Sequence, residues 1–221
     1  MIGSAHEQAP DEQTSAGGPA ESARDRLLSA AVSVFSVVGF EGASLRDVER
    51  RAGVNRGLAG YHFGGKAELW QAAVSWLMDR FHDEMSRYQD VLRVVSPQER
   101  GRVLVRVLVR FAAKYPEYFR LVLLEGSEQT ERSKWIAEEH VRRHIDFFHR
   151  LAGTGGLQDS EQEAIAYYAL LGAASTVFAV PEQCRQLFGL DPTEEAFVDL
   201  MADRMADLYL TVVDDPAAGR D

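Results

Sequence analysis

Four arginines lie close together in the first third of the chain, where their side chains could bind nucleic acid. They are Arg46, Arg50, Arg51 and Arg56. A guanidinium group presents paired N–H donors that fit a phosphate group or the edge of a guanine base. The same pattern would also arise on the solvated side of an ordinary helical hairpin. The cluster must therefore be judged by the elements that carry it.

Those elements are two short helices on either side of a glycine. Ser44, with Asp47 three residues later, predicts the start of a helix that ends at Gly53, where a left-handed turn is expected. Asn55 predicts the cap of a second helix that runs to about His62. Two short helices at this spacing fit a helix-turn-helix. The side chains expected to form its internal contact are Leu45, Val48, Val54 and Leu58.

The charge of the chain is unevenly distributed. Its 221 residues carry 24 basic and 34 acidic side chains, a net charge of -10. Residues 1–21 hold four acids and no base, residues 22–68 hold seven bases and five acids, and residues 69–221 hold 17 bases and 25 acids. DNA binding depends on local rather than total charge, so residues 22–68 are the candidate DNA-binding segment.

The fold class expected from the sequence is all-α. Apolar residues recur at helical spacing from Ser22 onward, without the alternation of strands. Residues 1–21 are rich in Gly, Pro, Ala, Ser, Glu and Gln, and predict a disordered tail. Further helices are expected from about residue 66, and over about 97–114, 116–125, 130–151, 160–179, 181–188 and 193–213.

Several other classes of protein and site are excluded or disfavoured. No run of about 18 apolar residues is present to span a membrane, and residues 1–21 lack the features of a secretory signal, so a cytoplasmic protein is expected. The single cysteine, Cys184, excludes an intramolecular disulfide. Residues 153–156 follow no strand and form no phosphate loop, and no catalytic signature occurs, so neither a cofactor nor an enzyme is expected. His140 and His144 share a helix face but have no third metal ligand at fixed spacing.

Four segments resemble the TetR family of bacterial transcriptional regulators. They are residues 35–40 (FSVVGF), 44–48 (SLRDV), 51–58 (RAGVNRGL) and 61–70 (YHFGGKAELW). The resemblance spans about residues 22–75. It implies a three-helix DNA-binding domain over residues 22–68 and a larger helical domain for ligand binding and dimerisation over residues 69–221.

The resemblance also implies roles for individual residues of the first domain. Asn55, Arg56 and Gly57 would open the recognition helix, and Arg56 would reach a base edge or a phosphate. Lys66 would join the free N–H groups of a helix N-terminus in a phosphate clamp. The complete set of expected DNA-binding residues is Ser44, Arg46, Asn55, Arg56, Gly57, Tyr61, His62 and Lys66.

Three residues depart from the family pattern. Gly60 stands where many members have a tyrosine that contacts a phosphate, and glycine weakens a short helix by about 1 kcal/mol relative to alanine. Glu49 stands where a small residue, usually alanine, is typical, and Ala59 is smaller than the usual leucine. We expect a size exchange, in which the stem of Glu49 fills the space left by Ala59 and its carboxylate reaches solvent or Arg50.

The larger domain is expected to hold a ligand pocket and a dimer interface, as the resemblance implies. The expected pocket residues are Tyr118, Phe119, Trp135, His140, His144, Phe148 and Tyr168. The expected interface consists of the last two long helices through Leu171, Ser175, Phe178, Phe197, Met201, Arg204 and Leu208.

The function expected from these observations is that of a homodimeric repressor. It would bind a palindromic operator in double-stranded DNA and be released by a small apolar or amphipathic effector. An activator role fits the same residues. The alternative is an all-helical small-molecule-binding protein or enzyme whose helix-turn-helix no longer binds DNA, an alternative that the acidic charge, Glu49 and Gly60 favour.

Overall fold

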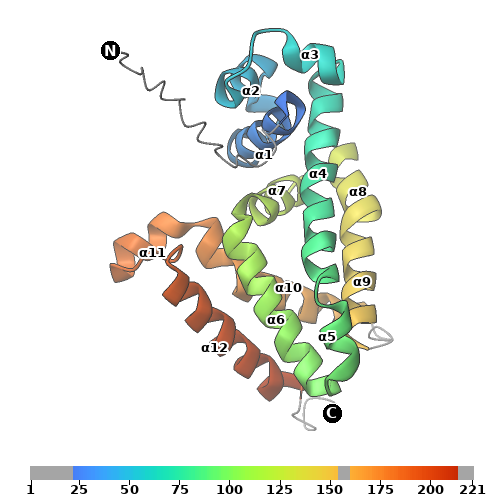
Figure 1. The fold of residues 1–221 in the computed structure, drawn as a ribbon, viewed down its shortest axis with the longest axis vertical. Helices are drawn as coiled ribbons and strands as arrows, with labels where there is room; N and C mark the ends of the chain where they lie inside the picture. The colour runs from blue at the N-terminus through green and yellow to red at the C-terminus, as the bar shows by residue number, and fades with distance from the viewer. Residues whose placement is uncertain (1–21, 154–159, 214–221) are drawn as a thin grey trace, which may run out of the picture.

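The computed structural model describes residues 22–153 and 160–213, and side chains as far as residue 208. The expected tail, residues 1–21, lies outside this part of the chain, as do residues 154–156 of the glycine-rich segment 153–156. Within the described ranges every regular element is a helix and no strand occurs, so the expected all-α class is confirmed. Figure 1 shows a small group of helices, the head, above a larger body, with one long helix joining them.

The head consists of three helices and the beginning of the long one: α1 (Ala23–Gly42), α2 (Leu45–Ala52), α3 (Leu58–Phe63) and α4 (Lys66–Ser86). Helix α1 starts where expected, because the Ser22 hydroxyl accepts the N–H of Asp25. It kinks at Gly39, which has φ 70° and ψ 177°, a backbone conformation that disfavours side chains. The kink turns Phe40 toward Trp70, with the two rings 6.1 Å apart.

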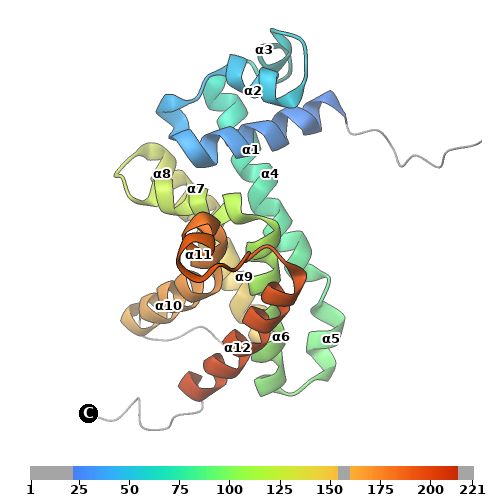
Figure 2. The same ribbon diagram turned by 90° about the vertical axis from the view of Figure 1, so that its left-hand side faces the viewer.

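Helix α4 belongs to both the head and the body. Its apolar stripe is buried throughout: Leu69, Trp70, Ala73, Val74, Leu77 and Phe81. At the upper end Trp70 packs against Phe40 of α1, and at the lower end the Phe81 ring lies 5.2 Å from that of Phe111 in the body. Helix α7 lies beneath α1 in both views (Figures 1 and 2), so the head also contacts the body directly.

The body contains the remaining helices. In chain order they are α5 (Gln89–Val94), α6 (Pro97–Lys114), α7 (Pro116–Gly126), α8 (Glu131–Trp135), η1 (Ile136–Val141), α9 (Arg142–Ala152), α10 (Ser160–Ala179), α11 (Pro181–Phe188) and α12 (Glu195–Val213). A capping box formed by Ser96 and Glu99 starts α6. Helix α5 was not expected. The single helix expected over residues 130–151 contains a π-helical turn, η1, whose extra residue per turn cannot be read from apolar spacing.

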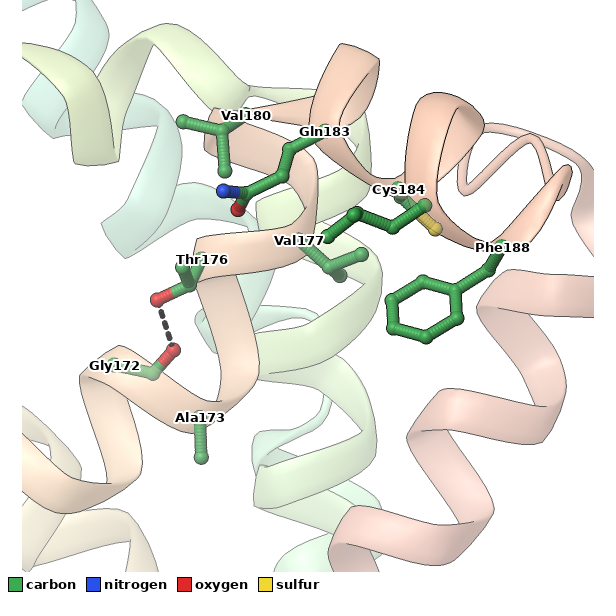
Figure 3. Close-up of a pocket in the computed structure, with 9 residues that line it drawn as sticks. Gly172, Ala173, Thr176, Val177, Val180, Gln183, Cys184 and Phe188 are labelled. Carbon is green, nitrogen blue, oxygen red and sulfur yellow. Dashed lines mark hydrogen bonds between the residues drawn. The ribbon is translucent and has the colours of Figure 1, made fainter.

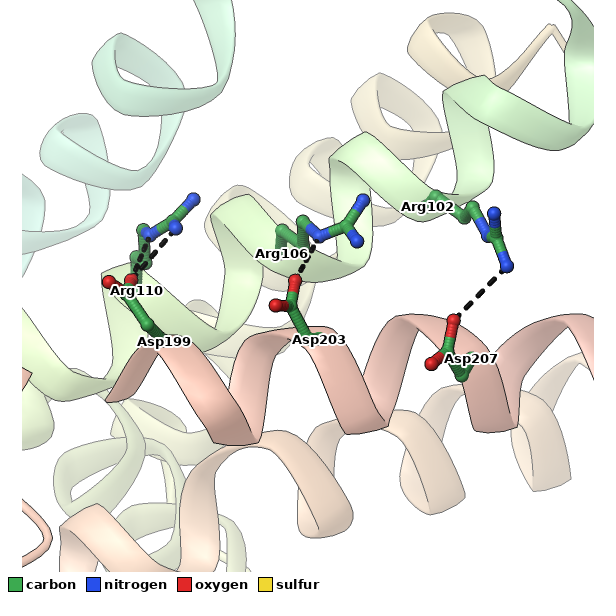
Figure 4. A network of polar contacts seen from close by, with 6 residues as sticks. All are labelled: Arg102, Arg106, Arg110, Asp199, Asp203 and Asp207. Carbon is green, nitrogen blue, oxygen red and sulfur yellow. Dashed lines mark hydrogen bonds and ion pairs between the residues drawn. The ribbon is translucent and has the colours of Figure 1, made fainter. Parts of the chain in front are cut away.

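Helices α6 and α12 lie side by side and run antiparallel, joined by three ion pairs (Figure 4). The three arginines recur every four residues on α6, and the three aspartates do so on α12, so each set occupies one helix face. The pairs are Arg102–Asp207 at 3.1 Å, Arg106–Asp203 at 2.7 Å and Arg110–Asp199 at 2.8 Å. Because numbers rise along one helix as they fall along the other, this ladder fixes both direction and register.

The central pair of the ladder can be tested by exchanging its charges. Arg106→Asp alone and Asp203→Arg alone are each expected to lower the free energy of unfolding by about 0.5–1 kcal/mol, since both side chains are partly exposed. The double variant Arg106→Asp/Asp203→Arg should recover most of the loss. Urea unfolding at one protein concentration, at low and at high salt, measures this coupling. Losses that simply add would show that the pair does not interact.

Candidate nucleic-acid interface

Helices α2 and α3 form the expected helix-turn-helix. Gly53 ends α2 with φ 63° and ψ 37°, the left-handed conformation that a tight turn requires. Val48 is fully buried, and Leu45, Val54 and Leu58 pack against the core. The expected internal contact is therefore present, and it leaves the arginines of α2 and the Tyr61 and His62 side chains of α3 on the outside.

The N-terminus of α2 is capped by Ser44, as expected. Its hydroxyl accepts the N–H of Asp47 at 3.2 Å and is itself exposed. Hydrogen bonds from the Ser44 hydroxyl and from Arg50 lower the pKa of Asp47 below its usual value. Arg50 is thus paired with Asp47, at 2.7 Å, and is not an unpartnered cation.

Basic and aromatic side chains around the turn are exposed. Arg46, Arg51 and Arg56 all lie at the surface, and Tyr61 is 83% exposed. The rings of Tyr61 and His62 lie 5.3 Å apart, edge to face. An aromatic side chain so fully exposed at the end of a short helix gains little from packing within this chain, so it is available to a partner.

The start of the recognition helix differs from expectation. Asn55 and Arg56 belong to the turn, and α3 begins at Leu58, whose N–H bonds to the Asn55 carbonyl at 3.3 Å. Gly57 is the N-cap residue, with φ 88° and no capping side chain of its own. The expectation that Asn55 caps this helix is therefore wrong, since its side chain makes no capping bond.

The carboxylate of Glu49 does not reach solvent or Arg50, so that part of the expected size exchange is also wrong. Glu49 is only 5% exposed. Its Oε1 accepts the N–H of Gly57 at 2.9 Å and the N–H of Ala59 at 3.0 Å. The side chain does lie against Ala59, but it does so as a hydrogen-bond acceptor at the start of α3.

The Lys66 side chain points toward the end of α1, whereas the expected phosphate clamp needs it to point outward. Its Nζ donates to the Glu41 carbonyl at 3.3 Å and lies 4.5 Å from the centre of the Phe40 ring. Arg132 of the body lies 4.2 Å from the same ring and pairs with Glu41 and Glu125. In this structure Lys66 therefore links α1 to α4, and it would reach a phosphate only after leaving that carbonyl.

The expected ligand residues fall into two places. Tyr118, Phe119, His140 and His144 are buried in the body, and Trp135 and Phe148 are half-buried beside them. Tyr168 is 68% exposed on α10, so the structure contradicts its place in a pocket. The residues of α10 that point into the body lie further along the helix, at Ala174, Ser175 and Phe178.

The buried group is centred on a hydrogen bond between two neutral side chains. Tyr118 Oη lies 2.7 Å from His144 Nδ1, with Phe81 packed against both rings. Burial lowers the pKa of His144 to about 3 and raises that of Tyr118 well above its usual value. A hydrogen bond between His144 and the backbone of Met78 opposes this lowering of the His144 pKa. His140 Nε2 is buried without a hydrogen-bond partner.

The expected dimer interface is only partly exposed. Ser175 and Phe178 are each 2% exposed and lie in the interior of this chain, where the Ser175 hydroxyl bonds to the Leu171 carbonyl. Their place in the interface is therefore wrong. Leu171, Phe197 and Met201 are half-buried, whereas Arg204 and Leu208 are exposed.

A different apolar surface lies over α10, α11 and α12. Large apolar side chains are exposed along it, and an open groove of about 310 Å³ lies between α10 and α11 (Figure 3). Cys184, which is buried, forms part of the groove wall. The exposed side chains are Ile165, Tyr168, Leu187, Phe188, Leu200 and Leu208. We call this the α10–α12 face.

Two other kinds of site, a metal centre and a membrane-spanning helix, have little support in the described residues. In the described part of the chain, no group of three or more histidine, cysteine, aspartate or glutamate side chains could hold a metal ion. No single helix there has the length and apolarity to span a membrane, and α10 with α11 meets that criterion only as a pair bent by 74°.

Comparisons with known proteins agree with this arrangement. Residues 27–73 match the family model described as bacterial regulatory proteins, tetR family. The HTH-type transcriptional regulator SrpR of Pseudomonas putida is 28% identical over 138 residues, covering 51% of this chain and 64% of that protein. The HTH-type transcriptional repressor NicS of Pseudomonas putida is 27% identical over 110 residues, covering 50% of this chain and 51% of that protein. The matches thus span about half to two thirds of these relatives.

Solved structures extend the likeness to the body. A TetR-like transcriptional regulator from Rhodococcus sp. RHA1 superposes with a TM-score of 0.61 at 23% identity, covering 87% of this chain and 97% of that one. The fatty acid degradation regulator FadR from Bacillus halodurans gives 0.61 at 16% identity, covering 86% and 97%. At these identities the likeness shows the fold alone. The named relatives are regulators and not enzymes. Residues 27–73, which include the helix-turn-helix, thus match the family model of the tetR bacterial regulatory proteins, and the fold of the chain is similar to that of a solved TetR-like regulator.

Proposed function

We propose that this protein is a transcription regulator that binds duplex DNA through α2, α3 and the turn between them. The observation that carries the proposal is the set of exposed side chains on these two helices and the turn: Arg46, Arg51, Arg56, Tyr61 and His62. The core beneath them is buried, so these groups project from a fixed frame. The acidic remainder of the chain keeps other surfaces away from DNA phosphates.

Arg56 is the residue proposed to read bases. It is exposed and directly precedes Gly57, the N-cap residue of α3, and its guanidinium can bind guanine O6 and N7 together. Arg46 and Ser44, at the start of α2, are proposed to contact backbone phosphates. The expected phosphate clamp at Lys66 supports this proposal less than Arg56 does, because the Lys66 ammonium donates a hydrogen bond to the Glu41 backbone carbonyl.

We further propose that two copies associate through the α10–α12 face and bind a palindromic operator. Exposed apolar side chains gather there, whereas soluble monomers seldom leave such a surface uncovered. Two recognition helices related by a twofold axis can enter successive major grooves roughly 34 Å apart. A single small helix-turn-helix binds weakly, and pairing two of them raises the affinity.

The proposed effector site is the buried group around Tyr118 and His144. This group is apolar apart from a few polar atoms, and His140 Nε2 lacks a partner there. Such a site suits a small apolar or amphipathic molecule. The effector would act by binding the DNA-incompetent state more tightly, with a coupling of about 1–3 kcal/mol typical. The relative named as a transcriptional repressor supports a repressor role.

The DNA-binding proposal can be tested with a duplex that carries the sequence flanking the protein's own gene. The protein should retard this duplex in a gel even when mixed-sequence competitor DNA is present in excess. Arg56→Ala is expected to cost about 1–3 kcal/mol of binding free energy and to relax the preference at one or two base pairs. Arg93→Ala, a matched change on α5 in the body, should leave binding unchanged. If Arg56→Ala weakens all duplexes equally, Arg56 contacts the backbone instead.

The dimer proposal predicts a particle of twice 24.6 kDa in solution. Leu200→Glu places a charge on the α10–α12 face, where Leu200 is 56% exposed, and should shift the mass toward that of one chain. Val37→Glu is the matched control, because Val37 is 68% exposed but lies on α1. Light scattering after size-exclusion chromatography gives the mass. A wild-type monomer at micromolar concentration would contradict the proposal.

The neutral state of the buried pair predicts a pH dependence of stability. His144 has a pKa of about 3 in the folded chain against 6.5 ordinarily, so between these values the unfolded chain binds a proton that the folded chain does not. Stability should therefore fall as the pH drops below 6.5, by up to about 1.4 kcal/mol per pH unit from this residue. His144→Gln should reduce that slope, while the exposed control His62→Gln should not. Equal slopes in urea unfolding of wild type and His144→Gln would show that His144 is protonated when folded.

A further inference from the structure

The recognition helix α3 is poorly equipped to form without help from elsewhere. It has only six residues, Leu58–Phe63, and isolated helices of that length are unstable in water. Gly57 is its N-cap and supplies no side chain, and Gly60 weakens its interior. Its first backbone N–H groups consequently need an acceptor from another part of the chain.

Glu49 of α2 supplies that acceptor. One carboxylate oxygen accepts two N–H groups at the start of α3, those of Gly57 and Ala59. The backbone carbonyl of Glu49 also accepts the N–H of Val54, at 3.2 Å. A single residue thus binds the turn through its main chain and the recognition helix through its side chain.

A carboxylate is well suited to this position. The N-terminus of a helix carries partial positive charge, and hydrogen bonds to an ionised acceptor are roughly twice as strong as neutral ones. A buried charge without such bonds would destabilise the head, but here both N–H groups satisfy it. Alanine, which the family pattern favours at this position, could accept neither bond.

We propose that Glu49 is the positioning residue of the recognition helix, holding α3 in its DNA-reading orientation before DNA arrives. This inference rests on the proposed DNA-binding function. Because Glu49 orders α3 during folding, the free energy of DNA binding is not spent on ordering this helix. Arg56 lies just before α3 and Tyr61 lies within it. Both side chains are then presented to DNA from a preformed helix.

The capping itself is tested on the free protein by amide hydrogen exchange. Glu49→Leu keeps an apolar stem but removes the acceptor, so the amides of Gly57 and Ala59 should exchange roughly 10- to 100-fold faster. Glu49→Gln retains a carbonyl acceptor and should keep most of the protection. Glu68→Gln, which changes an exposed acid in the first turn of α4, should leave both amides unaffected. Equal exchange in wild type and Glu49→Leu would overturn the proposal.

The double variant Glu49→Ala/Ala59→Leu separates capping from packing. It restores the pair of side-chain sizes typical of the family without restoring the acceptor. If Glu49 acts only by filling space, the double variant should protect the residue 57 and 59 amides as the wild type does, and the proposal fails. If Glu49 acts as a cap, these amides stay fast in the double variant even when its thermal stability recovers.

The affinity of Glu49→Leu for the duplex from the flanking sequence distinguishes two roles of Glu49, electrostatic repulsion of DNA and positioning of α3, because they predict changes of opposite sign. Removing an acid from a DNA-binding head should strengthen binding by electrostatics alone. A positioning role predicts instead that Glu49→Leu binds roughly tenfold or more weakly, with rescue by Glu49→Gln. Tighter binding by Glu49→Leu would overturn the proposal. Failure of the wild type to bind would refute the regulator function, while the exchange measurement, which needs no DNA, would still decide the capping.

Discussion

The continuous buried stripe of α4 is the constraint on which the other arrangements depend. At one end Trp70 packs against Phe40 of the head, and at the other Phe81 packs against Phe111 and Tyr118 of the body. Helix α4 has 21 residues and is therefore about 30 Å long. A rod of this length, buried at both ends, ties the orientation of the recognition helix to the packing around Tyr118 and His144. The candidate DNA-binding head and the candidate effector site are for that reason coupled through α4.

Three of the polar groups inside the chain join two helices and hold them in a single alignment. Glu49 joins α2 to α3, the Tyr118–His144 bond joins α7 to α9, and Arg120 of α7 donates to the last carbonyls of α10. Each would destabilise the fold if its partner moved, because an unpaired buried polar group costs on the order of 1–3 kcal/mol. Apolar packing alone permits small slides of one helix over another. These hydrogen bonds select one alignment among those that packing allows.

The sequence predicted those features that depend on residues close together in the chain. The cap at Ser44 acts on an N–H group three residues away, so local spacing was sufficient. Features decided by tertiary contacts were missed. The direction of the Glu49 carboxylate depends on where α3 packs, and the inward face of α10 could not be chosen because α10 is apolar on both sides. The orientation of Lys66 likewise depends on the kink at Gly39, which brings Phe40 and Glu41 within its reach.

The joint between head and body has an optical consequence. The Phe40 ring lies within 4.5 Å of Lys66 from the head and 4.2 Å of Arg132 from the body, and beside it the indoles of Trp70 and Trp135 lie 5.6 Å apart. Trp70 moves with α4 and Trp135 with the segment that leads into η1. Any tilt of the head would change the spacing of these two fluorophores and the cations around them. The fluorescence of these tryptophans thus reports the position of the head without an added label.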